Sequence, residues 1–100
     1  MQIPKSLRIS RKKYRIDVVN TAPKRGTMGE TDIRQRTILV ALRSTISNRV
    51  YRQEEVSNTF WHELTHAILA DMDHALWDDE RFVTAFANRL TEAINTARFD

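Results

Sequence analysis

The spacing of the apolar residues in this 100-residue chain changes near residue 53, and this change limits the folds open to it. Before residue 53, apolar and polar residues alternate, as in Leu7–Ile9 and Tyr14–Val18, which is the pattern of half-buried strands. After residue 53, apolar residues recur every three to four positions, the spacing of an amphipathic helix. Strands followed by helices predict an α+β fold.

The first half predicts a small, mainly antiparallel sheet of three to four strands. Two strands are expected on either side of a turn near 11–13, and the turn-forming residues at 20–26 predict a loop. A short strand over 29–32, a turn over 33–36 and a more buried strand over 37–42 then complete the sheet.

The second half predicts two helices packed on one face of that sheet. The first helix starts at Glu54, runs for about four turns and frays near 71–74. Its apolar stripe consists of Val56, Phe60, Leu64, Ala67 and Ile68. The second helix starts around 78–80, where acidic residues suit the helix dipole, and runs to about Arg98. Its expected buried face consists of Phe82, Val83, Phe86, Leu90 and Ile94.

Composition favours one small globular domain over residues 1–100. The chain is 41% apolar and 29% charged with two Gly and two Pro, which argues against disordered, collagen-like and low-complexity classes. No stretch approaches the ~18 apolar residues of a membrane helix. The start, residues 1–5, lacks the apolar stretch of a secretory signal, and the chain has no cysteine, so we expect a cytoplasmic protein whose metal ligands are His and carboxylates.

Charge is divided unevenly along the chain. Residues 1–52 hold 13 Lys and Arg against three Asp and Glu, a net charge of +10, whereas residues 53–100 hold three Arg against ten Asp and Glu, a net charge of −7. The basic half suggests a surface for DNA or an acidic partner. The alternative is a basic sheet that simply packs beside acidic helices, because the cations form no block of five or six like charges.

The strongest motif is His62-Glu63-Leu64-Thr65-His66, which matches H-E-x-x-H in the middle of the first expected helix. Four residues advance a helix by about 400°, so His62 and His66 project from nearly the same face and can share one zinc ion. Glu63 lies roughly 100° away, where it can act as general base on a zinc-activated water. The expected reaction is hydrolysis of peptide bonds.

A catalytic zinc site needs a third protein ligand. An extended metzincin motif would require Gly at position 69 and His at position 72, but the chain has Leu69 and Met72. The open candidates are Asp71, Asp73, His74, Asp78, Asp79 and Glu80. Glu80 is favoured because it opens the second helix, from which its carboxylate can project back onto the first helix. Asp78 and Asp79 fit better as helix-capping residues.

The stretch from 59 to 90 resembles the minimal gluzincin-type zinc metallopeptidases of phages and prophages, which are similar in core plan to ImmA/IrrE-type and SprT-like peptidases. The resemblance is carried by His62–Leu69, by Asp79-Glu80-Arg81-Phe82-Val83 and by Phe86–Leu90. It implies zinc bound by His62, His66 and Glu80, with Glu63 as base, in a zincin-like domain. If the chain is phage-encoded, its compartment is the host cytoplasm.

The resemblance also implies a protein or peptide substrate that binds by strand addition to a sheet strand bordering the cleft, and we expect this to be the strand over 37–42. No residue matches a motif for stabilising the oxyanion of the transition state; Tyr51 and His74 are the candidates. Two alternatives to a peptidase remain: a DNA-associated module, and a structural zinc site that stabilises a small domain without turnover.

Overall fold

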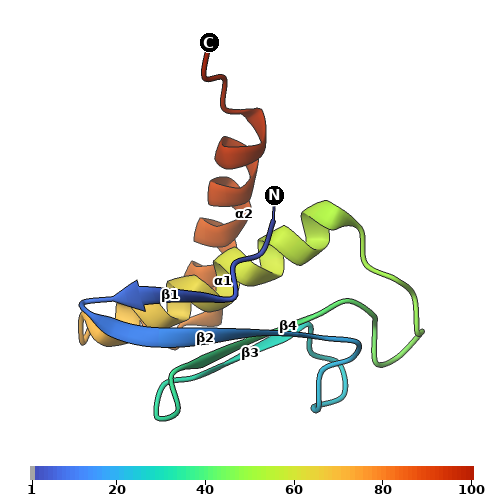
Figure 1. The fold of residues 1–100 in the computed structure, drawn as a ribbon, viewed down its shortest axis with the longest axis horizontal. Coiled ribbons are helices and arrows are strands. Elements are labelled where there is room, and N and C mark those ends of the chain that lie inside the picture. The colour runs from blue at the N-terminus through green and yellow to red at the C-terminus, as the bar shows by residue number, and fades with distance from the viewer. Residues whose placement is uncertain (1) are drawn as a thin grey trace.

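A computed structural model describes residues 2–100, and it consists of a four-stranded sheet followed by two helices (Figure 1). In chain order the elements are β1 (Ser6–Ile9), β2 (Lys12–Val19), β3 (Gly29–Asp32), β4 (Thr37–Ala41), α1 (Gln53–Asp71) and α2 (Glu80–Thr96). The α+β fold predicted from the apolar spacing is therefore confirmed, and the strands lie within two residues of their expected positions.

The sheet is mixed, with the order β1-β2-β4-β3. β1 pairs with β2 and β3 pairs with β4 in antiparallel fashion, whereas β2 and β4 run parallel, with Arg15 opposite Thr37. β4 lies in the interior of the sheet, and the side chains of Ile38, Val40 and Ala41 are fully buried there. β3 is left as the edge strand on the side of α1.

Two tight turns lie at the same end of the sheet. Ser10 and Arg11 join β1 to β2 with φ of 48° and 70°, and Arg36 ends the β3–β4 turn with φ of 55°. Positive φ is the usual requirement of a two-residue hairpin and is normally met by Asn or Gly. Because β2 and β4 are parallel, the turn that starts β2 and the turn that starts β4 are neighbours.

Helix α1 packs on β3 and β4 and closes the core. Val56, Phe60 and Ala67 are buried against the sheet, as the apolar stripe predicts. The prediction that Ile68 belongs to the buried stripe is wrong. This side chain is 40% exposed, because its position on the helix faces away from the strands. The helix begins at Gln53, one residue earlier than expected, and Oε1 of Glu55 accepts a hydrogen bond from the Arg52 backbone N–H at that end.

Helix α2 packs against α1 and not on the sheet, which corrects the expected arrangement. Its buried residues are Val83, Ala87 and Thr91. These side chains are small, so the two helices can approach closely. The larger residues of the expected face lie beside this contact: Phe82 is 37% exposed, Phe86 47% and Ile94 42%, while Leu90 is half-buried.

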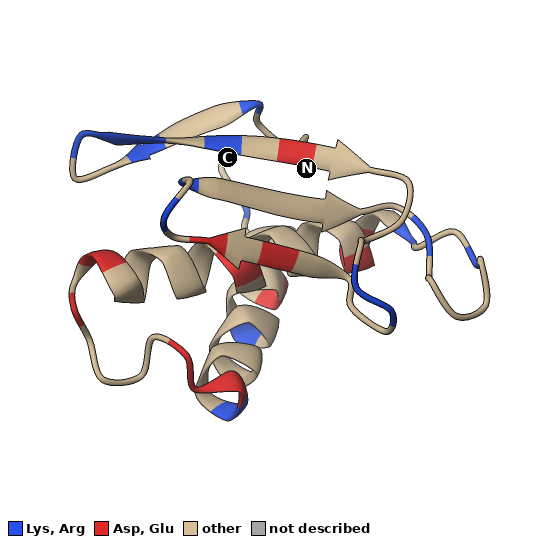
Figure 2. Ribbon diagram, turned by 90° about the horizontal axis from the view of Figure 1, so that it is seen from below, with Lys and Arg blue, Asp and Glu red and all other residues tan. Residues whose placement is uncertain are grey.

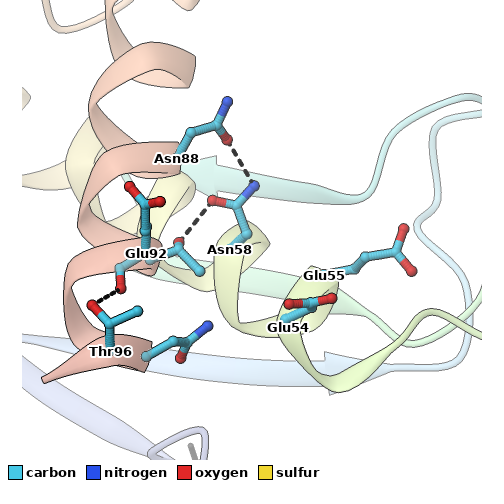
Figure 3. Close-up of a pocket in the computed structure, with 8 residues that line it drawn as sticks. Glu54, Glu55, Asn58, Asn88, Glu92 and Thr96 are labelled. Atoms are coloured by element: carbon cyan, nitrogen blue, oxygen red, sulfur yellow. Dashed lines mark hydrogen bonds between the residues drawn. The ribbon is translucent and has the colours of Figure 1, made fainter.

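Polar side chains also join the two helices, as Figure 3 shows. The Asn58 side-chain amide donates to Oδ1 of Asn88 at 3.1 Å, and its own oxygen lies 2.8 Å from the Thr91 hydroxyl. Thr91 is 8% exposed, so this contact is shielded from water. The position of α2 is therefore set by its interface with α1 and by the connection over 72–79.

Across residues 2–100, neither helix combines the length and apolar character that a membrane span needs.

Candidate metal centre

The two histidines of α1 and the first residue of α2 converge on one point. The Nε2 atoms of His62 and His66 lie 3.2 Å apart. Oε2 of Glu80 is 3.0 Å from Nε2 of His62, and Oε1 of Glu80 is 2.7 Å from Nε2 of His66. Within residues 2–100 these three side chains form the one His and carboxylate cluster able to hold a metal ion, with all ligand atoms within 4.8 Å of one another.

The hydrogen bonds of His66 determine which of its nitrogens is available to a metal. Its Nδ1 lies 2.7 Å from the backbone carbonyl oxygen of Trp77, which can only accept a hydrogen bond. Nδ1 therefore carries the proton, and Nε2 presents a lone pair to Glu80 when the ring is neutral. A backbone carbonyl on the second nitrogen is the usual way in which a ligating histidine is oriented.

The three groups fit a cation chemically. Lone pairs on two imidazoles and a carboxylate repel one another unless a positive charge lies among them, so the geometry requires a proton or a metal ion. In a tetrahedral site with bonds of 2.0–2.1 Å, two ligand atoms are about 3.3 Å apart. The 3.2 Å between the histidine nitrogens is close to this separation, whereas the 3.0 and 2.7 Å from the Glu80 oxygens to these nitrogens are hydrogen-bond distances. The side chains of His62 and His66 are 19% and 10% exposed, whereas that of Glu80 is 70% exposed.

Local structure at the start of α2 presents Glu80 to the histidines. Asp79 is the N-cap of α2, and its side chain accepts a hydrogen bond from the Phe82 backbone N–H at 3.0 Å. The capping role expected for Asp79 is thus confirmed. Because the cap fixes where the helix begins, the next residue, Glu80, points from the first turn toward α1.

Two other candidates for the third ligand are engaged elsewhere. Asp71 accepts hydrogen bonds from Ser10 at 2.6 Å and from Lys12 at 3.0 Å, which hold it at the β1–β2 hairpin and lower the pKa of its carboxyl group. His74 is exposed, and its Nδ1 lies 3.1 Å from the Leu76 backbone N–H. Asp73 and Asp78 are exposed residues of the connection and are not part of the cluster.

Glu63 lies on α1 between the two histidines and faces the sheet. It is only 9% exposed, and its Oε1 accepts a hydrogen bond of 2.7 Å from the hydroxyl of Thr31 on β3. Burial raises the pKa of Glu63, while the Thr31 hydrogen bond and the nearby histidines act in the opposite direction. The carboxylate is therefore held in one orientation beside the ligand cluster in a partly dry environment.

The contact between Thr31 and Glu63 depends on a close approach of β3 to α1. A Cβ atom at Gly29 would lie 2.7 Å from Cγ2 of Thr59, 2.8 Å from the Leu39 carbonyl oxygen and 3.0 Å from Cγ of Glu63. Only glycine fits there without displacing a neighbour. The sequence alone indicates no role for Gly29 or Thr31. Strand alternation places them on one face, but no local pattern indicates that this face meets Glu63.

Two clefts meet at the cluster, and both are lined by Glu63 and Glu80. One, of about 220 Å³, also has Thr31, Ile33, His66 and Trp77 in its wall. The other, of about 460 Å³, also has Gly29, Thr59, His62 and Thr84 in its wall. The point where the ligand atoms converge is thus open on the side of β3.

Two expectations about the surroundings of the site need correction. The strand over 37–42 cannot add a substrate strand, because β4 is already paired on both edges, to β2 and to β3. The strand with a free edge at the clefts is β3. Neither Tyr51 nor His74, the candidates for oxyanion stabilisation, lines either cleft. Tyr51 instead packs beside the core with Arg49 over its ring.

No protein-family model, curated protein or solved structure matches this chain. Its function is therefore inferred from the geometry of the site and from the motif that forms it.

Proposed function

We propose that this protein is a zinc metallopeptidase that hydrolyses peptide bonds in a protein or peptide substrate, in the manner of the minimal gluzincins. The observation that carries the proposal is the convergence of His62, His66 and Glu80 on one point beside the buried carboxylate of Glu63. Two histidines and one glutamate form a ligand set of catalytic zinc sites, and such sites keep a fourth position open. The two clefts at the cluster leave room for that position.

Each residue of the site has a distinct role in the proposed reaction. Zinc bound by the three ligands supplies a Lewis acid that lowers the pKa of water toward about 7 and polarises a carbonyl oxygen. Glu63 accepts a proton from water as the water oxygen bonds to the peptide carbon. The same carboxyl group then returns the proton to the amine as the C–N bond breaks. Thr31 keeps the Glu63 carboxylate oriented during both transfers.

The free edge of β3 is the proposed docking strand for substrate. Gly29, Thr31 and Ile33 of this edge and its turn line the two clefts, so an extended peptide along β3 would pass from one cleft to the other across the ligand cluster. Backbone hydrogen bonds to an edge strand bind a peptide with little dependence on its side chains.

The test combines cleavage of a broad peptide library with metal analysis of three proteins. We expect the wild type to bind about one zinc and to cleave, Glu63→Gln to bind zinc without cleaving, and Glu80→Ala to lose both properties. Glu30→Gln is the matched control, since Glu30 is an exposed residue of β3 outside both clefts. A Glu63→Gln variant as active as the wild type would rule out the mechanism. Zinc binding without hydrolysis of any peptide would favour a structural metal site instead.

A further inference from the structure

Five exposed cations gather at one end of the sheet without a carboxylate partner. Over residues 2–100, the ion pairs of the structure leave them unpaired. They are Arg8, Arg11, Lys13, Arg34 and Arg36, and we refer to them as the basic end. Figure 2 shows Lys and Arg together at the left end of the sheet, on the β1–β2 hairpin and on the β3–β4 turn.

The sheet topology brings these residues together from two separate segments. Arg8 and Lys13 are directly opposite each other on β1 and β2, with Arg11 in the turn between the strands. The parallel pairing of β2 and β4 places the β3–β4 turn alongside, and the Arg15 backbone N–H donates to the Arg36 carbonyl oxygen at 3.0 Å. The charge asymmetry seen in the sequence is therefore concentrated in space.

Three carboxylates near the basic end are already engaged. Asp17 pairs with Arg15 at 2.9 Å, and Asp71 pairs with Lys12 at 3.0 Å. Asp32 accepts a hydrogen bond from the Gln35 backbone N–H at 3.0 Å and so stabilises the β3–β4 turn. These contacts organise the hairpin and the turn while leaving the five cations free to meet an external anion.

The rest of this surface indicates what kind of anion fits. The large apolar side chains that are exposed in the structure all lie outside residues 6–15 and 33–36. Protein interfaces have an apolar core, whereas nucleic-acid interfaces are polar and strongly positive. The aromatic residue of the hairpin, Tyr14, is 2% exposed, so the surface offers no ring on which an unpaired base could stack.

We propose that the basic end binds double-stranded nucleic acid through its phosphate backbone. Four of the five cations are arginines, whose planar guanidinium groups match phosphate oxygens in pairs. The surface borders the metal centre, because Ile33, next to Arg34, lines the smaller cleft. A peptidase held on nucleic acid in this way would meet proteins bound to the same duplex. The binding itself does not depend on the proposed peptidase activity.

The direct test is fluorescence anisotropy of a labelled duplex titrated with full-length protein at several salt concentrations. Up to five phosphate contacts predict a slope of log K against log salt of about −4 to −5. The most informative variant is Arg11→Gly/Arg36→Gly, because both residues have positive φ, where glycine removes the charge and relieves the backbone. We expect it to weaken binding on the order of tenfold at low salt and to reduce the slope by about 2.

The matched control is Lys24→Ala/Arg25→Ala, which removes the same charge from the loop at the opposite end of the sheet. We expect this control to bind nearly as the wild type does. Equal loss in both double variants would mean that only net charge matters and would overturn the proposal. The proposal would also be overturned if single-stranded DNA or poly-glutamate bound as tightly as the duplex. Absence of duplex binding at low salt would overturn it as well.

Discussion

The hydroxyl of Thr31 on β3 lies 2.7 Å from Oε1 of Glu63 on α1, which joins the edge of the sheet to the motif helix. The same hydroxyl is 2.9 Å from the backbone carbonyl oxygen of Glu63. The residue proposed as general base is therefore positioned by the strand proposed to bind the substrate. If substrate binding shifts β3, the position of the Glu63 carboxylate would shift with it.

Replacing Thr31 with Val tests this link. The variant keeps the shape of the side chain but leaves Glu63 without its hydroxyl donor, and a hydrogen bond to a charged group contributes about 1.5–3 kcal/mol. We expect cleavage to fall about tenfold or more while zinc remains bound, because Thr31 is not a ligand. Thr31→Ser should restore most of the activity. Full activity in the Val variant would show that the hydroxyl does not position the base.

A second variant, Gly29→Ala, tests the close approach of β3 to α1. Its Cβ would lie 2.7 Å from Thr59 Cγ2 and 2.8 Å from the carbonyl oxygen of Leu39, and the backbone atom cannot move aside cheaply. Overpacking of this kind typically costs about 1–3 kcal/mol. We expect a lower midpoint of thermal unfolding and reduced cleavage. Glu30→Ala, an exposed neighbour, should change stability by less than about 0.5 kcal/mol, and an equal loss in both variants would contradict the steric explanation.

Acid should destabilise the fold in part through Glu55. Hydrogen bonds from the Arg49 side chain and the Arg52 backbone N–H lower the pKa of Glu55 to about 2 from an ordinary value of 4.5. A carboxyl group with a depressed folded-state pKa stabilises the fold above its unfolded pKa, and this contribution is lost as the pH falls from about 4.5 to about 2.

Thermal unfolding midpoints measured between pH 2 and pH 7 check this expectation. Glu55→Gln should lower the midpoint near neutral pH and flatten its decline below about pH 4.5. Glu54→Gln is the matched control, because the Glu54 carboxylate is 62% exposed and contacts Arg52 only at 3.8 Å. A Glu55 variant with the same acid decline as the wild type would contradict the role of this ion pair.

The polar contact between the helices should support the metal centre from a distance. Asn58 lies one helical turn before His62 and is bonded to Asn88 and Thr91 of α2 (Figure 3). We expect these bonds to hold α2 where Glu80 reaches the histidines. We expect Asn58→Ala and Thr91→Val each to lower stability by about 0.5–1.5 kcal/mol, since each removes the hydrogen bond between the helices, while the Thr91 hydroxyl in Asn58→Ala keeps its bond to the Ala87 carbonyl oxygen.

A double-mutant cycle for Asn58 and Thr91 separates the direct contact from general destabilisation. Because the two residues touch, the loss in the double variant should be smaller than the sum of the single losses. Zinc affinity measured by competition with a chelator should fall in both single variants. Strictly additive losses with unchanged zinc affinity would mean that this contact does not set the position of Glu80.

Much of the fold follows from local patterns in the sequence. Alternation identified β1 and β2, a run of β-formers identified β4, and the 3.6-residue period identified both helices. The packing of α2 was predicted wrongly because its large residues, Phe82 and Phe86, were assumed to face the core. In the structure the helices meet through Val83, Ala87 and Thr91, where small volume allows close approach. Periodicity locates an apolar stripe but does not show which part of it is covered.

The candidate site, like the fold, could be predicted only in part from the sequence. Spacing alone places His62 and His66 one turn apart, and the start of the second helix favours Glu80. The Thr31 hydroxyl, the Trp77 carbonyl and the close approach at Gly29 depend on contacts between distant segments, which no short motif contains. The strand with a free edge at the site could not be predicted either, because it depends on the sheet topology. Since β4 pairs with β2 on one side and with β3 on the other, the free edge belongs to β3.

The most direct measurement is the zinc content of the purified wild type beside Glu80→Ala and Glu63→Gln, by elemental analysis after loosely bound metal is removed. We predict about one zinc per chain in the wild type and in Glu63→Gln, and a large loss in Glu80→Ala. Wild-type protein without zinc, or Glu80→Ala with undiminished zinc, would contradict a centre formed by His62, His66 and Glu80.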